Sequence, residues 1–195
     1  WNKKNVADAA APKNYFDLVD PKWAGKVGSW VRAPNISNLA KMEGEARVRE
    51  FVQKLVANRA RMYDSTYQLA QEVGSGEIDV GFGLYHTTII PINQGAPIGW
   101  AFTDPIANAT IFSAVVNKGA NPEGAQVFAA WLGTAEGANA YEAGTGRGNP
   151  SVPGSKSNEL AKGRRLSEWS VDETPTYARL MAEFNKMLSD GRGGK

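Results

Sequence analysis

The sequence contains no cysteine and only one histidine, His86, among its 195 residues. The missing cysteines exclude thiol catalysis, cysteine-ligated zinc and a disulfide framework, and they leave the compartment open. A lone histidine has no second imidazole with which to form a two-histidine metal pair. We therefore expect neither a resident metal nor a cofactor.

Long apolar runs and an excess of one charge are also missing. No stretch approaches the roughly 18 apolar residues of a membrane-spanning helix, and residues 1–4 lack the apolar stretch of a signal peptide. The 22 basic and 20 acidic residues are scattered along the chain and give a formal net charge of +2. Nothing in this distribution indicates a nucleic-acid surface. With 42% hydrophobic residues, we predict a soluble globular chain with a real core.

Strand-like and helix-like segments alternate along the chain. The strand candidates are residues 27–31, 62–63, 78–84, 98–102 and 109–116. Helical patterns cover residues 45–58, 66–73, 85–90, 121–132, 136–143 and 177–188, and Ser37 or Asn38 is expected to cap a further short helix. This order predicts an α/β fold whose last helix docks on the sheet. Residues 144–157, rich in Gly, Pro and Ser, are the best candidate for a linker or crossing.

Polar residues follow the first two strand candidates, where helices are expected to begin. Asn35, Ser37 and Asn38 come after the first strand, and Asp64 and Ser65 after the second. A helix start presents free backbone N–H groups and the positive end of the helix dipole, so several starts on one rim can hold an anion. The alternative is that these residues only cap their own helices.

Tyr85 and His86 directly follow the strand candidate 78–84, whose two glycines allow close approach to the backbone. Open α/β sheets place their ligand crevice at this end of the strands. A phenol and an imidazole can donate or accept hydrogen bonds, or bind metal. The hypothesis is that at least one of them contacts a ligand, and the alternative is that both pack at a domain edge.

Other conspicuous residue types give weaker indications. Arg147, in the Gly-rich stretch, is a better anion-binding candidate than residues 164–165, a pair typical of a solvated surface. The tryptophans are expected in the core or at edges rather than in a stacking platform, because they occupy different elements with no common period. Those considered are Trp23, Trp30, Trp100, Trp131 and Trp169.

Enzyme motifs are missing as well. The sequence has no phosphate-binding loop, zinc-protease motif or nucleophile elbow. An enzyme would have to rely on Tyr85, His86 and Asp64 as its local acid–base groups. We assign no catalytic residue and predict a binding protein.

Four stretches, taken in order, are the most distinctive motifs of the sequence. In the most specific, residues 15–28, the letters DLVDP precede KWAGKV. This resembles the iron and small-solute branch of the bacterial extracellular solute-binding proteins, in which the phrase DLLDP precedes KWKGKI. The others are residues 63–81, with SGEIDVG, residues 95–105, with GAPI, and residues 121–137, with NPEGA. Together the stretches cover about residues 12–143.

The resemblance implies a type II periplasmic-binding-protein fold, in which two α/β lobes close on a ligand. It assigns residues 12–108 and 155–195 to the second lobe, and residues 1–11 to a crossing between lobes. Residues 109–150 return to the first lobe, most of which is missing, or pack locally in a fragment. In this reading the second lobe has a mixed sheet flanked by helices, and the chain is mature, trimmed or truncated.

The resemblance also implies the substrate-binding component of a bacterial ABC importer. We expect a periplasmic or otherwise extracytoplasmic monomer whose partners are a small solute and a membrane permease. Iron-binding relatives carry adjacent tyrosines after the central strand, whereas this chain has Tyr85 followed by His86. The departure favours an organic solute with an anionic group. An iron(III)-binding transport protein and the effector-sensing domain of a transcription regulator remain alternatives.

Overall fold

The computed structural model describes residues 1–108 and 119–192. Its sheet has three strands, β1 (Val27–Trp30), β2 (Arg61–Tyr63) and β3 (Val80–Phe82), in the order β2-β1-β3. Both pairings are parallel, with Gly28 of β1 opposite Arg61 on one side and Gly81 on the other. In the described residues the sheet is therefore parallel rather than mixed.

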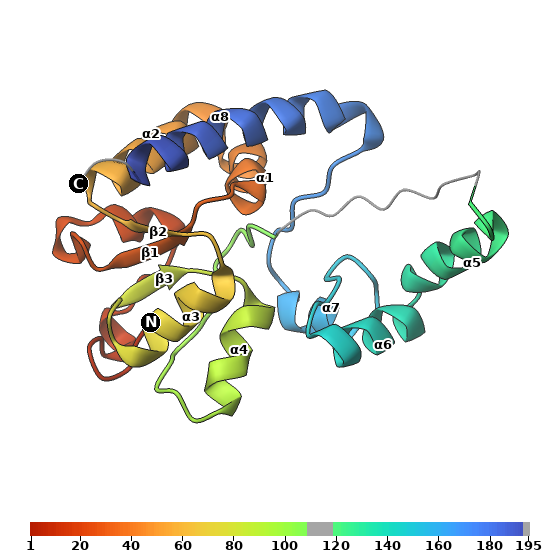
Figure 1. Cartoon of the computed structure of the whole chain (residues 1–195), viewed down its shortest axis with the longest axis horizontal. Coiled ribbons are helices and arrows are strands. Elements are labelled where there is room, and N and C mark those ends of the chain that lie inside the picture. The colour runs from red at the N-terminus through yellow and green to blue at the C-terminus, as the bar shows by residue number, and fades with distance from the viewer. Residues whose placement is uncertain (109–118, 193–195) are drawn as a thin grey trace.

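Helices follow each strand and cover both faces of the sheet (Figure 1). The α-helices are α1 (Pro34–Glu43), α2 (Glu45–Ala57), α3 (Thr66–Ser75), α4 (Tyr85–Asn93), α5 (Pro122–Leu132), α6 (Ala135–Thr145), α7 (Lys156–Ala161) and α8 (Thr174–Arg192). Short 3-10 helices are η1 (Asp8–Ala10), η2 (Tyr15–Val19), η3 (Pro21–Trp23) and η4 (Val171–Glu173). The predicted α/β class is confirmed. None of the helices in the described ranges has the combined length and apolar character that crossing a membrane requires.

The larger part of the core lies on the sheet face covered by α1, α2 and α8. Helical spacing places the apolar side chains of each helix on one stripe, and these stripes meet over the strands. The fully buried side chains at this junction include Leu39, Val52, Leu55, Phe184 and Leu188. Helix α8 contacts α1, α2 and β2, which confirms that the last helix docks on the sheet (Figure 1).

On the other face of the sheet, α3 packs directly over glycine. A Cβ at Gly28 would lie only 2.3 Å from Cδ1 of Leu69, so the missing side chain lets the helix approach. Leu69 and Val73 of α3 form a smaller core with Tyr63, Ile78 and Ile98. At Gly81 a Cβ would lie 3.1 Å from Val73, so the expected close approach to the third strand comes from α3.

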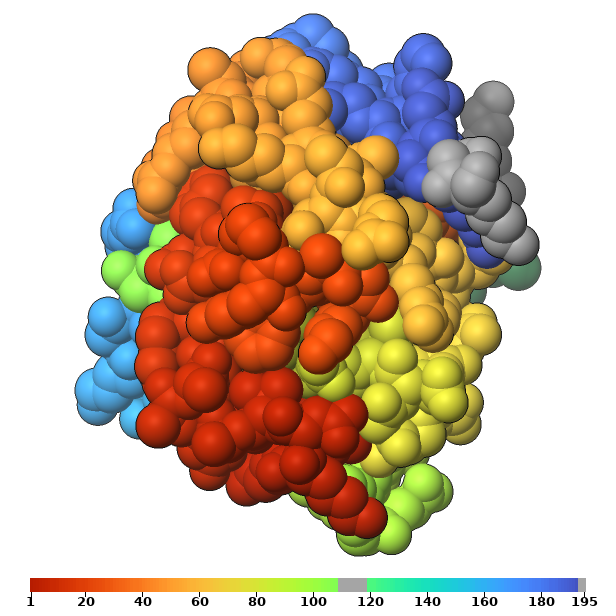
Figure 2. All heavy atoms as spheres, turned by 90° about the vertical axis from the view of Figure 1, so that its left-hand side faces the viewer, coloured from red at the N-terminus to blue at the C-terminus, as the bar shows by residue number. Residues whose placement is uncertain are grey.

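The N-terminal segment is tied to this second face. The Trp1 ammonium donates to the Gly99 carbonyl at 2.8 Å, and the Asn2 amide donates to the Asp79 carbonyl at 2.9 Å. The Asn2 side chain also donates to the Val73 carbonyl at 2.8 Å. In Figure 2, atoms of the N-terminal segment cover a large part of the face turned to the viewer. The chain start is therefore part of the packed structure.

Three local expectations are wrong or only partly right. Helix α1 begins at Pro34, whose fixed φ and missing N–H suit a first helical position, so Ser37 and Asn38 lie inside the helix rather than capping it. Residues 98–102 form no strand, because Ile98 makes a single antiparallel bridge with Asn2. The third strand spans Val80–Phe82 only. The strand expected at residues 109–116 lies outside the described residues.

Helices α5, α6 and α7 lie apart from the sheet (Figure 1). Residues 144–157 contain the turn between α6 and α7. Helix α5 begins as expected, with Asn121 accepting from the Gly124 amide at 2.9 Å, but none of its residues is buried. Two segments, residues 104–108 and 165–169, lie side by side next to the sheet, joined by a parallel bridge between Ile106 and Leu166.

Candidate ligand-binding cleft

A cleft of about 1340 Å³ lies between the sheet and the α5–α7 helices. Its walls include the carboxyl end of β3, the start of α4, residues 98–103 and residues 146–151. Parallel strands end together at one edge of a sheet, and the helices that follow them begin there. The cleft therefore lies where the sequence analysis expected a ligand crevice.

The start of α4 faces this cleft with Tyr85 and His86, which both line it. Within the described chain, Leu84 at the N-cap position makes no side-chain capping bond. The hydroxyls of Thr87 and Thr88 donate back to the Leu84 carbonyl at 3.0 and 2.9 Å. The first turn keeps N–H groups and a positive dipole end with no side-chain acceptor.

A guanidinium adds positive charge close to this helix start. Arg147 lines the cleft from the turn after α6. This turn lies next to the start of α4, as a Cβ at the neighbouring Gly146 would be 3.6 Å from Cβ of His86. Partial burial, and next the charge of Arg147, lower the pKa of His86 below its usual value. Among the described lining residues, Arg147 is the one arginine and Glu168 the one carboxylate.

Three aromatic rings meet in the cleft wall next to the same helix start. The ring centroid of Tyr85 lies 5.1 Å from that of Trp100 and 5.6 Å from that of Phe102, and the last two are 5.2 Å apart. Trp100 is 39% exposed. Trp100 thus lies in a cluster that lines the cleft rather than in the core. The sequence signal that could have indicated this is the i, i+2 spacing of Trp100 and Phe102.

At the start of α1 the candidate residues are buried. Asn35, Ser37 and Asn38 expose 2%, 0% and 0% of their surface. Asn38 accepts from the Trp169 indole and donates to the Asn108 carbonyl. Asn35 Oδ1 and Ser37 Oγ have no hydrogen-bond partner among the described residues. Of this helix start, Pro34 lines the cleft.

At the start of α3 the capping interpretation holds for Ser65. Its hydroxyl accepts from the amides of Tyr67 and Gln68 at 3.2 and 3.5 Å. Asp64 is directed to α8, where Arg192 holds both carboxylate oxygens and lowers the pKa of the carboxyl. The structure thus brings Tyr85 and His86 to the cleft wall, whereas the other five candidates lie at the starts of α1 and α3, next to lining residues Pro34 and Thr66.

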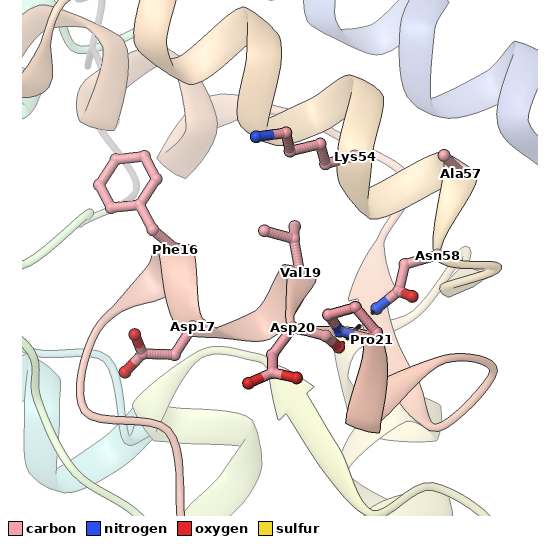
Figure 3. Close-up of a pocket in the computed structure, with 8 residues that line it drawn as sticks. All are labelled: Phe16, Asp17, Val19, Asp20, Pro21, Lys54, Ala57 and Asn58. Carbon is pink, nitrogen blue, oxygen red and sulfur yellow. Dashed lines mark hydrogen bonds between the residues drawn. The ribbon is translucent and has the colours of Figure 1, made fainter.

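A second hollow, of about 690 Å³, lies between η2, η3 and α2 (Figure 3). Its charged groups make local contacts, since Asp17 closes a capping box with Asn14 and Lys54 pairs with Glu50 at 2.7 Å. The Asn58 amide donates to the Asp20 carbonyl at 3.1 Å across the hollow. Within the described residues, no group of three or more His, Asp or Glu side chains is arranged to hold a metal ion. Because the polar groups of this second hollow are engaged in local contacts, the cleft is the candidate site.

Comparison with known families identifies the fold. Residues 2–144 match the family described as bacterial extracellular solute-binding protein. The chain belongs to this family. The solute-binding protein is 25% identical over 177 residues to an Fe(3+)-binding periplasmic protein of Serratia marcescens, a match that covers 78% of this chain and 50% of the relative. The chain thus spans about half the length of that curated relative.

The solute-binding protein also resembles the crystal structure of iron-bound HitA from Pseudomonas aeruginosa. The TM-score is 0.66 at 19% sequence identity, and the match covers 98% of this chain and 65% of the other. At this identity the likeness establishes the fold, and it confirms the predicted periplasmic-binding-protein architecture. The family consists of binding proteins rather than enzymes, and its extracellular setting, with the periplasmic relative, confirms the expected location outside the cytoplasm.

Proposed function

We propose that this solute-binding protein captures a small organic solute with an anionic group and delivers it to an ABC permease in the membrane. The observation that carries the proposal is the cleft wall in which the start of α4, without a side-chain cap in the described chain, lies close to Arg147. An anion at this place receives backbone N–H donors, a helix dipole and a guanidinium together.

The seven predicted residues have different parts in this proposal. Tyr85 and His86 contact the solute from the cleft wall. Ser65 keeps α3 in position by capping it, and Asp64 anchors the same turn to α8 through Arg192. The last three, Asn35, Ser37 and Asn38, belong to the start of α1. Buried oxygens of Asn35 and Ser37 have no partner among the described residues and are available to a ligand-bound state.

Closure of two lobes is the proposed mechanism of capture. We assign residues 12–108 and 155–195 to one lobe, residues 109–150 to the other and residues 1–11 to a crossing. Ile106 and Leu166 both lie in the first of these lobes, on neighbouring chain segments that lead towards the other, and two such segments side by side allow rotation about them. Solute bound between the lobes stabilises the closed form, and the permease docks on that form. The protein acts as a monomer, without nucleic acid.

Iron(III) is the second candidate solute, and the name of the Serratia relative favours it. A hard cation prefers oxygen ligands, and an ionised Tyr85 supplies one at the cleft wall. Other oxygens in the described lining include the Tyr67 and Tyr141 hydroxyls and the Glu168 carboxylate. Arg147 distinguishes the two candidates, since a guanidinium close to the site attracts an organic anion and repels a bare cation.

The test is a titration of the chain in the context of its complete reading frame. Calorimetry with organic phosphates, organic carboxylates and ferric citrate compares the parent protein with Tyr85→Phe, Ser65→Ala and Arg147→Gln. We expect an organic anion to bind and Arg147→Gln to weaken it about tenfold or more. Arg164→Gln is the matched control, because Arg164 is exposed and does not line the cleft.

Two results would contradict the proposal. Binding of ferric ion alone, weakened by Tyr85→Phe and unaffected by Arg147→Gln, establishes the iron candidate instead. An organic anion whose affinity is the same in the parent and in all three variants places the site elsewhere on the molecule.

A further inference from the structure

The rings of Tyr85, Trp100 and Phe102 form one pre-organised surface in the cleft. Their centroids lie 5.1 to 5.6 Å apart and their planes are inclined by 60°, 44° and 77°. Each ring therefore contacts the other two in the tilted and edge arrangements that aromatic pairs prefer. Rings that hold one another in place lose little conformational freedom when a ligand packs on them.

This surface is open to the cleft. All three residues line it, and Trp100 exposes 39% of its surface although tryptophan is usually well buried. An aromatic ring left open in a concave wall is available for a flat apolar group, whose burial removes both surfaces from water.

The cluster of three rings, called the aromatic wall below, shares a residue with the positive N-terminal end of α4. Tyr85 is the first residue of α4, so its backbone belongs to the helix start that faces an anion, while its ring belongs to the aromatic cluster. A ligand that uses both must carry its anionic group close to a flat ring. The charge near the site fits this, because Arg147 lies close enough to lower the pKa of the neighbouring His86.

From this arrangement we infer that the solute is an aromatic organic anion, in which a phosphate, phosphonate or carboxylate is attached to a ring directly or through a short linker. Trp100 and Phe102 determine specificity for the ring, and the start of α4 with Arg147 binds the anion. This inference rests on the proposed function. It goes beyond that function by naming the apolar half of the solute and two residues that select it.

The experiment compares three probes by calorimetry on the chain in its complete reading frame. The probes are phenyl phosphate, methyl phosphate and inorganic phosphate. We expect phenyl phosphate to bind about tenfold or more tightly than methyl phosphate, because ring stacking adds to the shared anion contacts. Trp100→Leu and, separately, Phe102→Leu should reduce this ratio towards one while leaving methyl phosphate affinity unchanged. Trp131→Leu, outside the cleft lining, is the matched control.

The outcomes separate this inference from the function on which it rests. Equal affinity for phenyl and methyl phosphate, or a ratio that survives both Trp100→Leu and Phe102→Leu, overturns the aromatic selectivity and leaves organic-anion capture standing. Failure of every phosphate and carboxylate probe, with ferric citrate binding, overturns both. The ratio measured on the parent protein needs no variant, so a substitution that fails to fold does not remove the test.

Discussion

Asn108 and Ser167 hydrogen-bond to each other twice. The Ser167 amide donates to Asn108 Oδ1 at 3.2 Å, and Asn108 Nδ2 donates to the Ser167 carbonyl at 3.1 Å. The two residues lie 59 positions apart, on the two segments that run side by side next to the sheet. The Asn108 side chain thus reproduces the reciprocal bonding of a strand pair and joins these segments into one unit.

Asn108→Ala should lower the free energy of unfolding by about 1–2 kcal/mol, because it removes both bonds and leaves partly buried backbone groups unpaired. Urea denaturation monitored by circular dichroism measures the change. Asn93→Ala is the matched control, since Asn93 is exposed at the end of α4. Equal stability of the two variants would mean that the segments are held together by other contacts.

Gly28→Ala should destabilise the fold by about 1–3 kcal/mol, the usual range for overpacking a core. The new methyl group would lie 2.3 Å from Leu69, and β1 is paired on both sides, so neither α3 nor the strand can move freely. Gly144→Ala provides the contrast. Apart from the helix's own backbone, no described atom lies within 4 Å of a Cβ at that position, and α6 should gain about 0.5–1 kcal/mol from the better helix former. Thermal melts of both variants test the opposite signs.

Leu188→Ala should cost about 2–5 kcal/mol, the range for a cavity left by a buried leucine. Leu188 of α8 is fully buried in the larger core. Val171→Ala, at a side chain 82% exposed, should change stability by less than about 0.5 kcal/mol. Chemical denaturation of both variants measures their free energies of unfolding. A small loss of this free energy in Leu188→Ala would show that the packing of α8 contributes little to the stability of the fold.

His86 should titrate below its usual pKa, first because of partial burial and then because of the charge of Arg147. The unfolded chain, with a pKa of about 6.5, takes up a proton first as the pH falls. The stability that neutral His86 contributes is therefore complete above about pH 6.5 and is lost as the pH falls through the lower folded-state pKa.

Proton NMR measures this titration without ambiguity, because the chain has one histidine. Arg147→Gln should raise the titration midpoint towards the usual value, whereas Arg164→Gln should leave it in place. A midpoint that does not move in Arg147→Gln would mean that Arg147 does not act on His86 in solution, and it would remove the guanidinium from the proposed anion site.

Local patterns predicted most of the regular elements correctly. The apolar spacing from Glu45 and from Tyr177 predicted helices α2 and α8, because residues three and four apart lie on the same face of a helix. The strand at residues 98–102 was wrong for the opposite reason. A strand needs partners along its length, and in the described residues only the start of this stretch, at Ile98 and Gly99, bonds to the N-terminal segment. Strand pairing depends on distant residues.

The candidate site was only partly accessible to the same reasoning. Placement after a buried strand was enough to select Tyr85 and His86. It gave no indication that the Asp64 carboxylate is held by Arg192 at the far end of the chain, 128 residues away. It also missed Trp100 and Phe102, because their contact with Tyr85 depends on how the segment after α4 folds back.

By itself, the sequence determined the α/β order, the helix stripes and membership of the solute-binding family, since each is carried by neighbouring residues or by motifs in fixed order. Only the tertiary structure decided which polar residues reach the cleft. It set an aromatic wall and Arg147 beside the start of α4 and directed Asp64 away to α8. The reason is physical: helix and strand patterns are local, whereas a cleft is made by side chains that chain folding brings together.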